Sequence, residues 1–248
     1  VAVGVLSLDA NTSGGSNVAL GTQALGTNIT GSYNTATGFE SMFANTASNN
    51  TAYGATSLRT NTSGVANTAL GQSTLYDNTE GGYNTAVGFL ALNDNTTASN
   101  NTAVGASALQ LNTTGASNTA LGHNAAANST TASNNVALGV NALNVNTTGA
   151  TNVAVGSGAL LRNTTASNNT SVGYNSLTAN TTGANNTACG QAALTACTTG
   201  SDNAALGTGA GLTLTTGSNN LLLGHDAGRT GSPGGNITSG SNEIVLGD

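Results

Sequence analysis

The sequence predicts an all-β fold, a parallel β-solenoid, from three observations: a fixed repeat length, apolar residues at fixed positions of the repeat, and recurrent turns of asparagine, threonine and glycine. Short phrases such as residues 101–105, Asn-Thr-Ala-Val-Gly, end in glycine along the whole chain. Twelve of the thirteen spacings between the first fourteen phrase glycines are 17 residues, and the step from Gly38 to Gly54 is 16 because a turn lacks one threonine. The phrase glycines are Gly4, Gly21, Gly38, Gly54, Gly71, Gly88, Gly105, Gly122, Gly139, Gly156, Gly173, Gly190, Gly207 and Gly224, and a last phrase ends at Gly247.

The residues before each phrase glycine predict a short strand. Alanine stands two residues before the glycine in twelve of fifteen phrases, and Thr, Val or Ile stands three residues before it in thirteen, a β-branched pattern that favours strands. Asparagine precedes this strand in 13 of 14 phrases, so coils stacked about 4.8 Å apart place asparagine over asparagine. We therefore expect a structural amide ladder. Its members include Asn84, Asn101, Asn118, Asn135, Asn152 and Asn169.

A second short strand is predicted after each phrase glycine. Leucine or methionine lies four residues after 11 of the first 14 phrase glycines, as at Leu92 and Leu109. Turns such as residues 112–115, Asn-Thr-Thr-Gly, join the two strands, because asparagine and glycine tolerate left-handed backbone. We expect about 14 coils over residues 1–224, followed by an irregular exit loop and final strand over 225–248. Because the chain begins at Val1 without methionine, we expect a piece of a longer protein.

The coils are narrow, with three or four apolar side chains each, so they need disulfides, ions or partner chains. Cys189 and Cys197 are expected to be free thiols, with a bridge between coils as the alternative. Partner chains are the remaining means of stabilisation. We place the Val or Leu before each phrase glycine and the later leucines inside the coil, and the small alanines on a face that a neighbouring chain approaches. The predicted chain contacts are Ala86, Ala103, Ala120, Ala137 and Ala154.

Composition excludes several function classes. Charged residues make up 5% of the chain, against roughly 25% in ordinary globular proteins. The chain has three Arg, no Lys and nine acids, so it has no basic surface for nucleic acid. No apolar run approaches the roughly 20 residues that span a bilayer, so we expect no membrane insertion of this segment.

No catalytic, cofactor or metal site is predicted. The nine acids occupy different positions of the repeat, mostly at turns, and form no acid–base pair. The residue directly after the phrase glycine is aromatic or histidine in several coils. These side chains form a candidate surface or ligand column, with an ordinary variable surface as the alternative reading. The column consists of Phe39, Phe89, His123, Tyr174 and His225.

The phrases NTAVG, NTALG and NVALG resemble those of YadA-like trimeric autotransporter adhesin heads, although the units of that family are shorter. The longer repeat with its NTTG turn is similar to bacteriophage tail-fibre and related surface-fibre proteins. The ending GSNEIVLGD, residues 240–248, resembles the stretch before a C-terminal intramolecular chaperone in such fibres, which implies a further C-terminal region after the final strand. The resemblance covers nearly the full length. It implies a left-handed parallel β-roll with three chains per head.

We therefore expect a homotrimeric, non-enzymatic fibre segment, a rigid shaft of a phage tail fibre or cell-surface adhesin. Such a shaft would be extracellular and attach to a host or surface, with a cell-surface glycan as one receptor class. Two alternatives stay open. An ice-binding β-solenoid would use threonine columns at the coil spacing, although the Thr-Ala-Val strand differs from the Thr-X-Thr strand that this function favours. A polysaccharide-degrading fibre would need an acid cluster that the sequence lacks.

Overall fold

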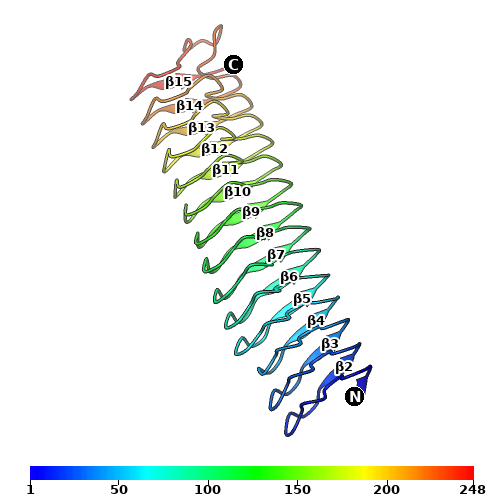
Figure 1. Ribbon diagram of the computed structural model, residues 1–248. Helices are drawn as coiled ribbons and strands as arrows, with labels where there is room; N and C mark the ends of the chain where they lie inside the picture. Colours follow the sequence, from blue (N-terminus) through cyan, green and yellow to red (C-terminus); the bar gives the residue numbers. More distant parts are fainter. The chain divides into compact units, whose positions relative to one another are not determined.

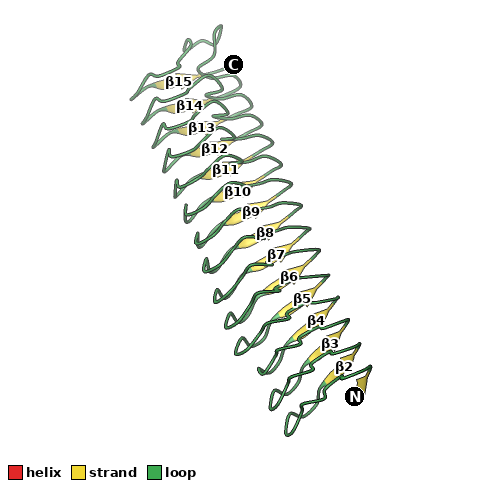
Figure 2. Cartoon of the chain, in the orientation of Figure 1, coloured by secondary structure: helices red, strands yellow, loops and turns green.

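The computed structural model describes residues 1–248, which form two compact units, Val1–Asn124 and Ala125–Asp248. Both units consist of strands and turns, without any helix (Figure 2). No helix long and apolar enough to cross a membrane is therefore present. The predicted all-β parallel solenoid with a period near 17 residues is confirmed, with about thirteen turns in the two units.

Each coil contributes one short strand that ends at the phrase glycine. Within each unit the strands pair in parallel and in chain order (Figure 1). The same phrase positions lie opposite one another, as Thr85 opposite Thr102. The first unit contains β1 (Ala2–Val3), β2 (Val18–Leu20), β3 (Thr35–Thr37), β4 (Thr51–Tyr53), β5 (Thr68–Leu70), β6 (Thr85–Val87), β7 (Thr102–Val104) and β8 (Thr119–Leu121). The second contains β9 (Val136–Leu138), β10 (Val153–Val155), β11 (Thr170–Val172), β12 (Thr187–Cys189), β13 (Ala204–Leu206), β14 (Leu221–Leu223) and β15 (Ile244–Leu246).

The prediction of a second strand in each coil is wrong. Leu90 and Leu92 have φ values of 58° and 50°, so the backbone repeatedly enters the left-handed region after the phrase glycine. Ala91 and Leu92 are both fully buried, whereas neighbouring residues of a strand point to opposite faces. This segment is a run of turns whose amides still bond both adjacent coils. Leu90 N–H donates to the Gln72 carbonyl at 3.2 Å, and Leu92 N–H donates to the Ala108 carbonyl at 3.0 Å.

The phrase glycines are required by backbone geometry. Gly88 has a φ of 123°, which side-chain-bearing residues rarely adopt. A Cβ atom at Gly88 would lie 2.7 Å from the carbonyl carbon and oxygen of Gly105 in the next coil. Conformation and close approach therefore both demand glycine at this corner.

The predicted facing of the strand is also wrong. The middle residue of each three-residue strand points into its own coil, and it is alanine except in β11, β14 and β15. The two flanking residues, such as Thr85 and Val87, point outward and are half-buried. The small alanine is needed there because the opposite wall carries the large buried leucines, such as Leu92, whose predicted interior position is confirmed. The alanines expected to contact a neighbouring chain are at most 1% exposed and cannot do so: Ala86, Ala103, Ala120, Ala137 and Ala154.

Coil length varies only at outward turns. The 16-residue coil after Gly38 still pairs Thr35 with Thr51, so the missing threonine is taken from an exposed turn. The last coil spans 23 residues between phrase glycines and still pairs Leu221 with Ile244. The predicted final strand is thus β15.

Candidate functional site

The predicted asparagine ladder is a structural element of the interior. All six predicted members are at most 2% exposed. The side-chain oxygen of Asn84 accepts the backbone N–H of Asn101 at 3.0 Å, and the Asn101 side-chain amide donates to the Gly115 carbonyl at 2.9 Å. The ladder therefore joins side chain to backbone as well as coil to coil. These amides are occupied and offer nothing to a ligand.

A second asparagine ladder runs through the turns, where the sequence analysis placed only turn residues. Asn78 donates its side-chain amide to Asn61 Oδ1 at 2.8 Å and to the Gly81 carbonyl at 2.9 Å. Cys197 interrupts this ladder in the second unit, and the buried Oδ1 of Asn180 has no hydrogen-bond partner.

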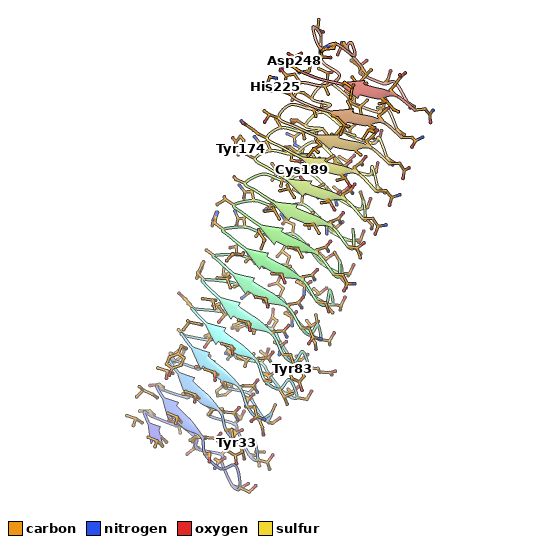
Figure 3. The ribbon with its side chains drawn as sticks, turned by 180° about the vertical axis from the view of Figure 1, so that it is seen from behind. Tyr33, Tyr83, Tyr174, Cys189, His225 and Asp248 are labelled. Carbon is orange, nitrogen blue, oxygen red and sulfur yellow. The ribbon has the colours of Figure 1, made fainter.

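Both cysteines are free, as the sequence predicts. Burial raises the pKa of the Cys197 thiol to about 11, and its Sγ lies 3.6 Å from the Gly200 carbonyl oxygen. Cys197 is therefore a protonated, inert interior side chain at neutral pH. Cys189 lies at the end of β12, on the outward side of the strand (Figure 3).

The candidate column after the phrase glycine lies on the surface, and its members do not gather into one site. Phe39 and Phe89 are exposed in the first unit and stand three coils apart. Tyr174 and His225 lie along one edge of the second unit (Figure 3), and His123 is exposed in the first. No group of three His, Cys, Asp or Glu side chains is placed to hold a metal ion.

His225 adjoins a small charged group in the last coil. Arg229 Nη1 lies 2.7 Å from Asp226 Oδ2, and His225 Nδ1 lies 3.8 Å from the same oxygen. The hydrogen bond from Arg229 is the main cause that lowers the pKa of Asp226. This group is partly buried and its acid is already paired with arginine, so it lacks the features of a catalytic acid or base.

A charged and aromatic cluster in the first unit was missed by the sequence analysis. Arg59 donates to Glu40 Oε2 at 2.6 Å, and its guanidinium carbon lies 5.4 Å from the Phe43 ring centre and 5.7 Å from that of Tyr76. Phe43, Arg59 and Tyr76 each lie five residues after a phrase glycine, so the repeat length alone stacks them in successive coils. Their common position in the repeat was the feature of the sequence that indicated this cluster.

Two exposed tyrosines were missed as well. Tyr33 and Tyr83 precede β3 and β6 and lie on the same edge of the first unit (Figure 3). The sequence contained a signal, since residues 31–39 and 81–89 share the pattern Gly-X-Tyr-Asn-Thr-Ala-X-Gly-Phe.

The outward residues of the strands form a continuous surface along each unit, here called the strand face. Its first column is mostly threonine and its second mostly valine or leucine, stacked in register from strand to strand. None of these residues is charged. Leu70, Leu121 and Leu206 are 48%, 50% and 56% exposed. An apolar, uncharged row of this kind is suited to contact with another molecule.

The fold defines the chain as a repeat protein of the parallel β-solenoid class. It matches no known protein family, no curated protein and no solved structure. The functional conclusion therefore depends on the surface described above.

Proposed function

We propose that the chain is a structural and adhesive fibre segment, a rigid shaft that assembles as a homotrimer. Its place would be extracellular, on a virion tail fibre or a bacterial surface, where it serves attachment to a host, a surface glycan or another receptor. The observation that carries this proposal is the exposed apolar column of the strand face. A soluble repeat protein with so few charges gains stability by covering such a column.

A trimer would bury the strand face, which an isolated chain leaves exposed to water. A typical coil encloses small alanines or serines, one leucine and two buried asparagines, so its own hydrophobic core is thin. Three strand faces turned toward a common axis would form a second core from Val, Leu and Thr side chains. Because the strand face carries no charge, identical copies would not repel one another there.

The proposed role is not enzymatic. The interior amides are bonded within the ladders, and the ion pairs Arg59–Glu40 and Arg229–Asp226 neutralise two of the nine acids. A polysaccharide-degrading fibre remains the alternative that an assay for reducing-sugar release would detect.

One observation favours a second candidate, an ice-binding solenoid. Thr68, Thr85 and Thr102 face outward in register on neighbouring strands, and their hydroxyls make no hydrogen bond within the chain. Such a regular hydroxyl row at about 4.8 Å matches the requirement for binding an ordered lattice. Thermal hysteresis of the purified protein measures this activity.

The trimer is tested by mass in solution. Light scattering should give a mass near three times 23.8 kDa. A variant with Leu70→Lys, Val87→Lys and Val104→Lys places three charges in the apolar column and should be monomeric. A matched control, Thr97→Lys with Thr114→Lys, changes exposed turn residues and should remain trimeric. A folded wild-type monomer at micromolar concentration would refute the proposal.

A further inference from the structure

Exposed aromatic residues occur as matched pairs at the two ends of a strand. Tyr33 precedes β3 and Phe39 follows it, and Tyr83 precedes β6 and Phe89 follows it. Tyrosine occupies the position two residues before the strand in these two coils only. Phenylalanine occupies the position after the phrase glycine in the same two coils only. The two positions are therefore coupled, although they lie at opposite edges of the strand face.

Contacts within one chain do not explain this coupling. The whole strand lies between the two members of a pair, β3 between Tyr33 and Phe39 and β6 between Tyr83 and Phe89. Their rings are largely in solvent: Tyr33 is 67% exposed and Phe39 52%, and Tyr83 and Phe89 are 65% and 51% exposed. Neither ring of a pair therefore helps to fill the coil.

The tyrosines also occupy an unfavourable backbone conformation. Tyr33 and Tyr83 both have a φ of 59°, in the left-handed region that disfavours large side chains. The same position is asparagine in seven other coils, which suits this conformation better. A strained, exposed tyrosine that does not stabilise its own coil points to a contact outside the chain.

We propose that the two ends meet between copies: Tyr33 of one chain packs against Phe39 of the next, and Tyr83 packs against Phe89 in the same way. This inference rests on the proposed trimer. In a cyclic trimer with strand faces toward the axis, the edge before the strand in one copy adjoins the edge after the strand in its neighbour, at the same level. Aromatic rings placed there pack edge-to-face or offset.

The pairs define the axial register of the assembly. β3 and β6 are three coils apart, roughly 14 Å at the usual strand spacing. Because all coils look alike, three chains could otherwise slide by one coil and still bury their strand faces. Aromatic contacts that occur in only two coils make the in-register alignment of the three chains more stable than the shifted ones. A glycan that stacks on the rings would not require tyrosine and phenylalanine at opposite ends of the same strand.

Site-directed cross-linking tests this contact. In a Cys189→Ser background, Tyr33→Cys with Phe39→Cys should give covalent trimers with a short bis-maleimide, because neighbouring copies then present thiols at the same level. A linker is used because the Cβ atoms of packed rings lie farther apart than the about 4 Å that a disulfide spans. The matched control, Tyr33→Cys with Phe89→Cys, has thiols three coils apart and should give none.

The outcomes separate this inference from the proposed function. A trimeric mass without covalent trimers from the matched pair, or with equal cross-linking of the control, overturns the aromatic contact and leaves the fibre proposal standing. A monomeric wild-type protein overturns both. As a second measurement, Tyr33→Ala with Phe39→Ala should weaken trimer association at least about tenfold, while Tyr174→Ala should not. If that double variant trimerises normally and loses binding on a glycan array, the rings bind sugar instead.

Discussion

Arg59 and Glu40 form the shortest ion pair of the chain, with 2.6 Å between Nε and Oε2. Glu40 lies in the shortened coil, and Arg59 lies in the next coil between the rings of Phe43 and Tyr76. Side-chain stacking across coils therefore spans the one place in the repeat array where a residue is missing. The ion pair and both ring contacts stabilise the folded unit, so removing the guanidinium should lower its free energy of unfolding.

Replacing Arg59 with alanine should destabilise the first unit by about 1–2 kcal/mol. A part-exposed ion pair contributes up to about 1 kcal/mol, and each ring contact contributes about 0.5–1 kcal/mol. Urea denaturation followed by circular dichroism measures the change. Arg162→Ala is the matched control, because Arg162 is exposed and makes no ion pair, and it should alter stability by less than about 0.5 kcal/mol. Equal effects of the two variants would contradict the role assigned to the cluster.

Replacing Cys197 with asparagine should stabilise the second unit by about 1 kcal/mol. The new amide would donate to the buried Oδ1 of Asn180, which has no partner, and would continue the turn ladder. Cys197→Ala is the control, since it removes the thiol without supplying a donor and should not stabilise. Thermal denaturation compares the three proteins, and equal melting temperatures for the two variants would argue against the ladder.

Cys197 should resist alkylation in the folded protein. Its pKa of about 11 leaves almost no thiolate at pH 8, and burial blocks access to the reagent. Iodoacetamide should therefore label Cys197 only when the second unit unfolds, which mass spectrometry of quenched samples detects. Labelling of Cys197 in native buffer, at the rate found in 6 M guanidinium, would show that this position is not interior.

Replacing a phrase glycine should be far more damaging than replacing an open glycine. Gly88→Ala combines a disfavoured φ with a 2.7 Å contact and should cost at least about 3 kcal/mol. Gly15→Ala should cost less than about 1 kcal/mol, because no atom lies within 4 Å of a Cβ built there. Chemical denaturation of both variants provides the comparison, and similar losses would contradict the geometric argument.

Removing one whole coil should preserve the fold. Deletion of residues 105–121 joins Val104 to Gly122 and restores a complete phrase, so each remaining coil keeps its neighbours' contacts. Deletion of residues 105–116 removes five fewer residues and places inward side chains on the surface. Hydrogen exchange should show protected strands in the first variant and local loss of protection in the second. Loss of protection in both would mean that this coil is not interchangeable.

The sequence predicted the repeat, the parallel stacking and the buried leucines because these follow from period and residue type. It could not decide which side of the three-residue strand faces inward, because Ala103 and Val104 are both apolar. The opposite wall decides that question: the large leucines, such as Leu109, leave room only for alanine. The second strand was mispredicted because leucine, like other residues with a Cβ atom, disfavours the left-handed region, so its residue type does not predict the φ values near 50° found there.

The candidate surface was predicted in part for a similar reason. Counting from the phrase glycine placed Phe39 and Phe89 in one exposed column. Counting from the phrase glycine also gives Phe43, Arg59 and Tyr76 the same position in successive coils. This shared position predicts that Arg59 lies between the two rings. The contact of Arg59 with Glu40 in the neighbouring coil depends on side-chain rotamers and on the shortened coil. The position of a residue within the repeat does not predict such a contact.

Coil length changes only where the chain faces solvent. One coil has lost an exposed threonine, and the last has 23 residues instead of 17, a gain of six, while the strands stay paired. The equivalent exposed turns at Thr97 and Thr114 should therefore accept foreign peptides. Peptides grafted there would emerge in a single file about 4.8 Å apart. Neighbouring exposed turns of one unit are therefore suited to carrying short peptide epitopes at intervals of one coil.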